Sequence, residues 1–414
     1  MDKLIVKGGF ELEGEVKVSS AKNASLPIMA ACILNPNIVN LKNLPALSDI
    51  SFFKKILESL GATTGANKID CSSINNFKAD YDLVRKMRAS VLVLGPLLSR
   101  FNEAIVSLPG GCAIGTRPVD IHLDGMKALG ADIEIKNGYI HAHTKGLVGC
   151  EINLPFASVG ATENLIMAAV YAKGKTVIHN YAKEPEVIDL INFLNESGAS
   201  IEHDEDKVYI SGVELNSLKP IEYNIIGDRI EAATLIIAAL ITKGHVKVSG
   251  FNPEHIESVL DVLEKAGAKF SCGIDYVEVL KTTELNAVNF KTDVHPGFPT
   301  DVQAQMMTLF ASLNEPSQIH ETIFENRFMH VPELNRLGFN IDVEGHFANV
   351  SRPNEILAAP VMCTDLRASA ALVLGAMIAK GDTEVARVYH LDRGYEGLET
   401  KLSSIGANIK RIKE

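Results

Sequence analysis

The chain has 414 residues, of which 46% are hydrophobic and 22% charged, values typical of a globular protein. This length exceeds what one hydrophobic core usually serves, so we expect two or three domains. A net charge of −11, without lysine or arginine runs, argues against a nucleic-acid-binding surface. We also expect no signal peptide, no membrane span and no membrane partner, because no apolar stretch has the required length or position. The six cysteines lie far apart without CxxC spacing, which fits free thiols in a reducing cytosol and predicts a cytoplasmic protein.

A short pattern recurs six times along the chain. In each copy an amphipathic helical run ends at a glycine, and a β-like run follows at once. The glycines follow one another at intervals of 68 to 71 residues, at Gly61, Gly130, Gly198, Gly267, Gly338 and Gly406. Glycine is the usual residue where a helix ends in a left-handed conformation. Each copy therefore predicts a helix C-terminus followed by a strand.

Upstream of each glycine lies a second helical run that is rich in alanine and apolar on nearly every face. In chain order these runs cover residues 20–34, 87–98, 158–174, 228–244, 299–313 and 365–381. Helices that are apolar all round are buried, so we expect these to pack closely together. Most are followed by a short alternating strand, such as residues 176–179 and 245–249.

The two patterns predict an α/β protein built from six similar repeats of about 69 residues. A stacked solenoid and two globular domains of three repeats each both fit this arrangement. The ends of the chain show no atypical polar repeats of the kind that cap a solenoid, which favours two domains.

The segment 107–122 concentrates chemically active groups. It holds Cys112, Arg117 and Asp120 together with three glycines, a density that favours an irregular loop able to approach a ligand closely. A thiol five residues before an arginine lies in a positive field, which suits an acid or a nucleophile. A surface turn with an incidental cysteine is the alternative. No cysteine pair has metal-ligand spacing, so we predict no metal site.

Charged residues stand at or near the starts of the buried helices, at Lys22, Arg88, Arg229, Asp301 and Arg367. A cation at the positive end of a helix dipole is unfavourable unless an anion compensates it. Several such starts facing one cleft would make an anion-binding site. Alternatively, each cation pairs with a local acid, and Asp228–Arg229 and Asp365–Arg367 look like such pairs.

Two further segments offer candidate functional groups. Asp301 follows two prolines and lies near a helix start, where it serves either as a helix cap or as a general base. Close to the C-terminus, His390 is more typical of a structural histidine. Arg393 beside Gly394 is the better candidate for a carboxylate or phosphate contact, because guanidinium geometry matches both groups.

Eight segments together resemble the UDP-N-acetylglucosamine 1-carboxyvinyltransferase family of enolpyruvyl transferases. They are Lys22–Asn23, MRAS at 87–90, PGGCAIGTRPVD at 109–120, SVGATEN at 158–164, PGFPTDVQAQ at 296–305, ETIFENRFMHVPEL at 321–334, DLRASAALVL at 365–374 and DRGYEG at 392–397. The resemblance covers essentially the whole chain. The cysteine loop separates this family from the shikimate-pathway enolpyruvyl transferases, which share the sixfold repeat.

The resemblance implies an inside-out α/β barrel of two domains with three repeats each. The first domain would span residues 20–226, the second residues 1–19 with 227–414, and the active site would lie in the cleft between them. The implied reaction moves the enolpyruvyl group of phosphoenolpyruvate onto the 3-hydroxyl of UDP-N-acetylglucosamine and releases phosphate. It would be the first committed step of peptidoglycan synthesis in a bacterial cytoplasm, with no cofactor and no metal.

The resemblance also implies roles for individual residues. Cys112 would donate a proton to the methylene carbon of phosphoenolpyruvate and could form a covalent adduct with it, while Asp301 would accept the proton of the sugar hydroxyl. Phosphate and carboxylate would be held by Lys22, Arg117 and Arg393. The sugar-nucleotide site would further be lined by Asn23, Arg88, Pro118, Val119, Asp120, Ile121, Ser158, Val159, Gly160 and Ile323. Arg327 and Arg367 would support these groups from behind.

Some positions depart from the pattern of certain relatives. Ala46 and Ser48 stand where some members carry basic residues, Phe156 where some carry a lysine directed at the nucleotide phosphates, and His295 where an aromatic residue is more usual. These departures concern nucleotide contacts rather than the reaction.

Three other functions compete with this interpretation. The chain could be a shikimate-pathway transferase, or a repeat-built binding scaffold whose helix-start charges are merely paired. It could also be a cysteine hydrolase that uses Cys112 and His122, although the sequence shows no third group to orient the histidine.

Overall fold

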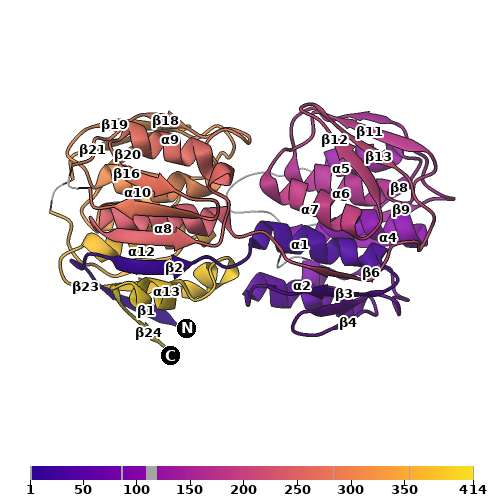
Figure 1. Cartoon of the computed structure of the whole chain (residues 1–414), viewed down its shortest axis with the longest axis horizontal. Helices are drawn as coiled ribbons and strands as arrows, with labels where there is room; N and C mark the ends of the chain where they lie inside the picture. Colours follow the sequence, from indigo (N-terminus) through magenta and orange to yellow (C-terminus); the bar gives the residue numbers. More distant parts are fainter. Residues whose placement is uncertain (1, 85–86, 109–118, 283, 354, 414) are drawn as a thin grey trace. The chain divides into compact units, whose positions relative to one another are not determined.

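The structure is a computed structural model of the chain, and it describes residues 2–84, 87–108, 119–282, 284–353 and 355–413. The chain divides into two compact units. Unit 1 contains the residues up to 19 and from 227 onward, and unit 2 contains the described residues between 20 and 226. Figure 1 labels many of their elements. Among the described helices, none is long and apolar enough to cross a membrane.

Unit 2 is built around three buried helical segments. These are α1 (Lys22–Ala31), the 3-10 helix η2 (Arg88–Val93) that continues into α4 (Leu94–Phe101), and α6 (Val159–Ala169). Helix α4 packs on α6, and α1 contacts both α6 and η2. The amphipathic helices of the unit are α2 (Ser48–Ser59), α5 (Asp120–Ala128) and α7 (Pro185–Glu196), with the short α3 (Tyr81–Val84) and η1 (Cys32–Leu34) between elements.

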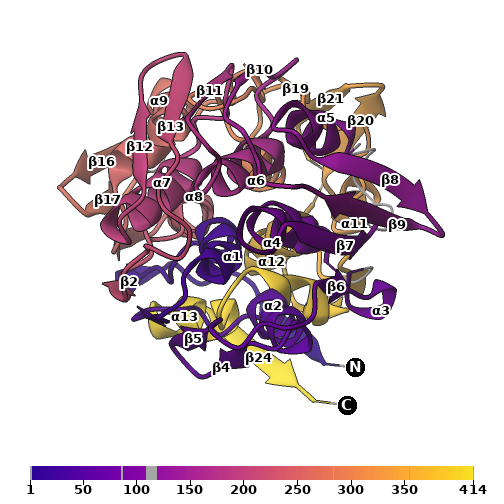
Figure 2. The ribbon, with the colours of Figure 1, turned by 90° about the vertical axis from the view of Figure 1, so that its right-hand side faces the viewer.

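Three four-stranded sheets cover these helices (Figure 2). In spatial order their strands are β14 (Ile221–Tyr223), β3 (Ile38–Leu41), β5 (Lys68–Asp70) and β4 (Thr63–Thr64); β6 (Lys78–Ala79), β7 (Glu103–Ser107), β9 (Tyr139–His143) and β8 (Asp132–Lys136); and β10 (Glu151–Asn153), β11 (Lys175–His179), β13 (Lys207–Ser211) and β12 (Ser200–His203). The first pair in each sheet is parallel and the others are antiparallel. Side chains alternate between buried and more exposed positions along most strands, as expected for sheets with one face on a core.

Unit 1 repeats this plan. Its buried helices are α8 (Arg229–Ile241), η4 (Thr300–Val302) with α10 (Gln303–Ala311), and α12 (Leu366–Ile378), which contact one another. Its amphipathic helices are α9 (Glu257–Lys265), α11 (Val331–Arg336) and α13 (Leu398–Ser404), with 3-10 turns η3 (Pro253–Ile256) and η5 (Val388–Arg393).

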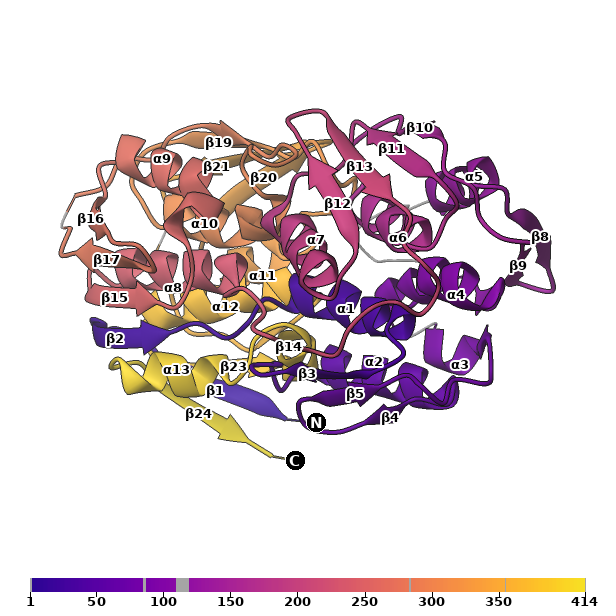
Figure 3. The ribbon, with the colours of Figure 1, turned by 45° about the vertical axis from the view of Figure 1, so that its right-hand side comes forward.

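The sheets of unit 1 include strands from both the first and the last part of the chain. Their spatial orders are β16 (Lys269–Cys272), β17 (Tyr276–Leu280), β15 (His245–Ser249) and β2 (Glu13–Lys17); β18 (Phe290–Lys291), β19 (Ser317–His320), β21 (Phe347–Ser351) and β20 (Asn340–Glu344); and β22 (Val361–Met362), β23 (Asp382–Ala386), β1 (Lys3–Lys7) and β24 (Asn408–Ile412). Strand β1 lies between β23 and β24, so the two ends of the chain pair in one sheet (Figure 3).

The predicted fold class is confirmed. In each unit three buried helices pack together and the sheets lie outside them, which is an inside-out α/β arrangement with one sheet per repeat. Strand β14 returns to pair with β3, and β2 pairs with β15, so each unit closes on itself and no solenoid forms. The six repeat glycines have φ between 92° and 110°, a region that only glycine enters without strain.

Candidate functional site

Asp301 lies at the centre of a charged cluster in unit 1. It belongs to the η4 turn, directly before α10. Nη2 of Arg327 donates to its Oδ1 at 2.6 Å, and Nη2 of Arg367 donates to its Oδ2 at 2.9 Å. The structure therefore brings together three of the predicted site residues, from segments that are far apart in the sequence.

The charges in this cluster interact strongly, because the two cations are buried and solvent screens them little. The side chains of Arg327 and Arg367 are only 4% and 5% exposed, against 27% for Asp301. Burial lowers the pKa of Arg367, but the nearby Asp301 carboxylate more than offsets this, with help from Tyr395 and Asp228, and the pKa stays above its ordinary value. Nη1 of Arg367 is buried and has no hydrogen-bond partner within the described residues.

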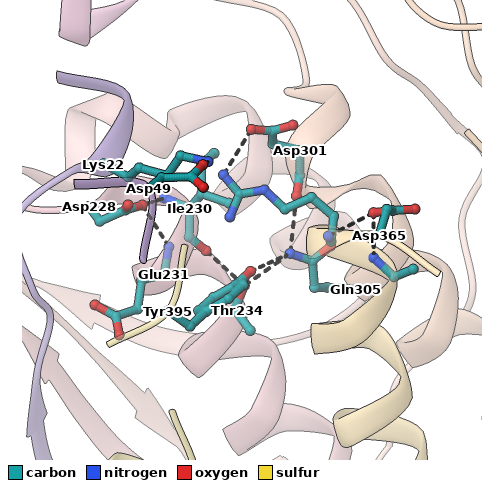
Figure 4. Close-up of polar contacts among 12 residues, drawn as sticks. Lys22, Asp49, Asp228, Ile230, Glu231, Thr234, Asp301, Gln305, Asp365 and Tyr395 are labelled. Atoms are coloured by element: carbon teal, nitrogen blue, oxygen red, sulfur yellow. Dashed lines mark hydrogen bonds and ion pairs between the residues drawn. The ribbon is translucent and has the colours of Figure 1, made fainter. Parts of the chain in front are cut away.

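A buried polar network fixes the backbone around Asp301 (Figure 4). Nε2 of Gln305 lies 3.0 Å from the Asp301 carbonyl oxygen, 3.0 Å from Thr234 Oγ1 and 3.1 Å from the Tyr395 hydroxyl. The Tyr395 hydroxyl also lies 2.9 Å from Thr234 Oγ1. These contacts join α8, α10 and the segment after η5, so the position of Asp301 is set by all of them.

Two other predicted residues of unit 1, Ile323 and Arg393, are connected to this network, the first through hydrogen bonds and the second by its position in the sequence. The Ile323 N–H donates at 2.9 Å to Glu321, whose other carboxylate oxygen accepts from Thr300, the neighbour of Asp301. Arg393 ends η5, two residues before Tyr395. Burial, and then the charge of Arg393, lower the pKa of His390, which agrees with a structural rather than a catalytic histidine.

Lys22 is the first residue of α1 in unit 2, and Ala21 before it provides no side-chain cap. Its Nζ lies 2.8 Å from Oδ2 of Asp49, in the first turn of α2. Both side chains are largely buried, at 11% and 7% exposure. The carboxylate therefore orients the ammonium group at the helix start, while Asn23 follows as a half-buried neighbour.

Three other features of unit 2 meet around His122. The Nδ1 atom of His122 lies 3.1 Å from Nδ2 of Asn164. Burial, and then the charge of Arg88, lower the pKa of His122 to about 4. A Cβ atom on Gly160 would lie 3.4 Å from Cε1 of this ring. The predicted nucleotide residues Arg88 and Gly160 are therefore both neighbours of His122.

The remaining predicted residues that the structure describes lie at the N-termini of two helices. Val119, Asp120 and Ile121 form the start of α5, and Ser158 and Val159 the start of α6, where Ser158 makes no side-chain capping bond. Cys112, Arg117 and Pro118 lie outside the described residues. Among the described residues, no group of three or more histidine, cysteine or acidic side chains could hold a metal ion.

One predicted pairing is wrong. Asp365 does not bind the guanidinium of Arg367, because its Oδ1 caps α12 by accepting from the N–H groups of Arg367 and Ala368 at 2.8 and 3.0 Å. Asp228 caps α8 in the same way through Ile230 and Glu231. These two buried helices do have ordinary caps, and the Arg367 side chain is left to reach Asp301.

Four residues of these networks were not predicted from the sequence, namely Asp49, Asn164, Gln305 and Tyr395. A signal for two of them lies in the repeat itself. Asn164 bonds to Gly95, 69 residues away, and Gln305 bonds to Thr234, 71 residues away. Both separations match the repeat length, so equivalent positions of neighbouring buried helices meet. A polar residue in an otherwise apolar helix could have been paired with its equivalent one repeat away.

Asn164 also bears on the hydrolase alternative. It is the third group that orients His122, and its amide occupies the lone pair of Nδ1. In the neutral ring, Nε2 then carries the proton. Neither nitrogen is left to accept a proton from a thiol, which argues against a cysteine hydrolase.

Comparison with known proteins gives consistent relatives. The chain matches the family model of EPSP synthase (3-phosphoshikimate 1-carboxyvinyltransferase) over residues 6–402. It is 51% identical to the UDP-N-acetylglucosamine 1-carboxyvinyltransferase of Acinetobacter baylyi and 49% identical to that of Geobacter metallireducens, in both cases over 100% of each chain. A protein of the same description from Coxiella burnetii is 50% identical, over 100% of this chain and 96% of its own length.

Solved structures are similar over the same length. The enolpyruvyl transferase NikO from Streptomyces tendae has a TM-score of 0.88 and 26% identity, over 100% of this chain and 99% of that chain. EPSP synthase from Acinetobacter baumannii has a TM-score of 0.74 at 13% identity over 100% of both chains, a likeness in fold alone.

Proposed function

Because the chain belongs to the enolpyruvyl transferase family, we propose that it moves the enolpyruvyl group of phosphoenolpyruvate to the 3-hydroxyl of UDP-N-acetylglucosamine, with release of phosphate. One observation supports UDP-N-acetylglucosamine as the acceptor. The chain is 49–51% identical over its full length to three proteins described as UDP-N-acetylglucosamine 1-carboxyvinyltransferase. The product would enter peptidoglycan synthesis in a bacterial cytoplasm.

The reaction is an addition followed by an elimination. In the addition, the methylene carbon of phosphoenolpyruvate gains a proton, and the sugar oxygen forms a bond to the neighbouring carbon as it loses its own proton. In the elimination, that carbon releases phosphate and the new methyl group loses a proton. The proposal assigns the first proton to Cys112 and the acceptance of the hydroxyl proton to Asp301.

The Asp301 cluster supports this assignment. Two guanidinium groups favour the ionised form of a carboxyl group, and only that form can accept a proton from the sugar hydroxyl. The charge of Arg367 favours the carboxylate or phosphate of the tetrahedral intermediate. The proposal adds Lys22, Arg117 and Arg393 as further cations for these anionic groups.

The sugar nucleotide is assigned to residues of unit 2. Arg88 and the start of α6 at Ser158, Val159 and Gly160 supply a cation and backbone N–H groups, which suit phosphate oxygens. Asn23, Pro118, Val119, Asp120 and Ile121, together with Ile323 of unit 1, complete the proposed set. No cofactor takes part in the proposed reaction.

The proposal is tested by phosphate release from phosphoenolpyruvate with two acceptors in parallel. We expect release with UDP-N-acetylglucosamine, none with shikimate 3-phosphate, and loss of release in Cys112→Ala. Cys272→Ala is the matched control, because Cys272 is an exposed cysteine of β16 outside the proposed site, and it should leave the rate unchanged. Release with shikimate 3-phosphate alone would move the chain to the other branch of the family, and release with neither acceptor would reject the proposal.

A further inference from the structure

The side chain of Asn164 is fixed by three hydrogen bonds inside unit 2. It is fully buried on α6. Its Oδ1 accepts from the Gly95 N–H at 2.7 Å, and its Nδ2 donates to the Val91 carbonyl at 3.0 Å. A backbone N–H group can only donate and a carbonyl can only accept, so these two contacts determine which end of the amide is oxygen and which is nitrogen.

The fixed amide determines the protonation of His122. The second N–H bond of Asn164 faces Nδ1 of the imidazole at 3.1 Å, so Nδ1 has to accept. A proton on Nδ1 would place two donors against each other. The ring is therefore neutral, with its proton on Nε2. Burial and the charge of Arg88 favour the same neutral state, because they lower the pKa of His122 to about 4.

The Nε2 side of the ring faces the start of α6. A Cβ atom built on Gly160 would lie 3.4 Å from Cε1 and 3.7 Å from Nε2 of His122. Helix α6 has eleven residues, and its N-cap residue Ser158 makes no side-chain capping bond. His122 is 93% buried, being 7% exposed, and within the described residues its Nε2 has no hydrogen-bond partner. A largely buried histidine, whose Nε2 has no partner among the described residues, thus lies beside a helix start.

We propose that Asn164 is a positioning residue that holds His122 as a neutral Nε2–H donor toward an anionic oxygen of the sugar nucleotide at the start of α6. This inference rests on the proposed function for the identity of the ligand. A phosphate oxygen there would accept from Nε2–H and from the first-turn amides of α6. A donor that stays neutral keeps its hydrogen bond throughout the pH range of catalysis, whereas an imidazolium would lose charge and affinity as pH rises through its pKa.

Among the described residues, the charged group that lowers the pKa of His122 is Arg88 on η2, which disfavours a second positive charge on the ring. Helix α6 presents the uncharged groups Asn164 and Gly160 to the ring. We therefore expect the affinity for UDP-N-acetylglucosamine to show no titration of His122 between pH 5.5 and 8.

Two substitutions of His122 distinguish the roles of its two ring nitrogens. In His122→Gln the amide nitrogen reaches the place of Nε2, so the donor to the ligand is kept. In His122→Asn the amide reaches only the place of Nδ1, so the contact with Asn164 is kept and the donor is lost. Calorimetric titration with UDP-N-acetylglucosamine should give a Kd within about threefold of the wild type for Gln and about 10- to 100-fold weaker for Asn, the effect of one hydrogen bond to a charged group. Equal affinities of the two variants would overturn the proposal.

A second experiment reads the tautomer directly and needs no ligand. Imidazole nitrogen chemical shifts of protein labelled in histidine, assigned with His122→Gln, should show a protonated Nε2 and a bare Nδ1 from pH 5.5 to 8. In Asn164→Asp a carboxylate oxygen faces Nδ1 instead of an N–H group, so the proton should move to Nδ1 or the ring should become charged. A wild-type His122 that carries its proton on Nδ1, or that titrates above pH 6, would contradict the inference.

The matched control is Asn195→Asp on α7 of the same unit, because Asn195 bonds only to the backbone of Ile201 among the described residues. It should leave the affinity and the His122 spectrum unchanged. Asn164→Asp should instead weaken the Kd, if the proton moves to Nδ1, or make the Kd pH-dependent, if the ring becomes charged. Absence of turnover in the wild type would reject the proposed function, while the tautomer measurement would still decide this inference.

Discussion

Asp301→Asn should lower the rate of phosphate release by about a thousandfold, within the usual range for loss of a general base. The substitution keeps the shape of the side chain but removes the charge that Arg327 and Arg367 share. One amide oxygen can accept from only one of the two guanidinium groups, so the other loses its acceptor. Leaving a buried cation without its partner costs about 3–5 kcal/mol, so the free energy of unfolding should fall as well.

The loss of rate and the loss of stability can be separated. In the double variant Asp301→Asn with Arg327→Gln, one buried cation is removed together with the anion, so much of the stability should return while the rate stays low. Asp293→Asn is the control, since Asp293 pairs with Lys291 at the surface of the same segment. Retention of more than about a tenth of the wild-type rate in Asp301→Asn, well above the loss expected for a general base, would show that Asp301 is only a structural partner of the arginines.

Lys22→Met should lower the rate of phosphate release about 100- to 1,000-fold, as expected when one fixed charge is removed from a developing anion. The ion pair between Lys22 and Asp49 is buried, so this variant also leaves the Asp49 carboxylate without its lysine partner and should be less stable. Steady-state kinetics with phosphoenolpyruvate and thermal unfolding give the two effects.

The double variant Lys22→Met with Asp49→Asn distinguishes catalysis from structural pairing. Removing both charges should restore most of the stability, because the ammonium group and the carboxylate that pairs with it are removed together. The rate should remain low if Lys22 contacts the substrate. A double variant that regains the wild-type rate would mean that Lys22 serves only to pair with Asp49, as the binding-scaffold alternative requires.

Most of the fold could be predicted from the sequence, because short local patterns indicate the helices and strands of each repeat. The six glycines mark helix ends that require positive φ, and the apolar alanine-rich runs mark helices without a solvent face. Closure of each unit was not predictable in this way. The pairing of β14 with β3 and of β1 with β24 joins segments at the ends of the units and depends on the tertiary structure.

Residues of the candidate site could be named from the sequence, but their contact partners could not. Asp301, Arg327 and Arg367 follow from family motifs, yet the contact between Asp301 and Arg367 spans 66 residues and is not encoded in either motif. The expected pair Asp365–Arg367 was wrong for a physical reason: a short aspartate at a helix N-cap reaches backbone N–H groups more easily than the side chain two residues later. The role of Asn164 depends on Gly95 and Val91, whose backbone groups have no sequence signature.

The most direct test of the proposed reaction is a proton NMR spectrum of phosphoenolpyruvate and UDP-N-acetylglucosamine incubated with the protein in deuterium oxide. We predict an enolpyruvyl ether on the 3-oxygen of the sugar, with deuterium in its methylene group. Addition of a deuteron creates a methyl group whose hydrogens exchange places by rotation before one is lost, so addition and elimination leave deuterium in the product. An enolpyruvyl product without deuterium would contradict the addition–elimination mechanism, and the absence of any enolpyruvyl sugar nucleotide would contradict the assigned activity itself.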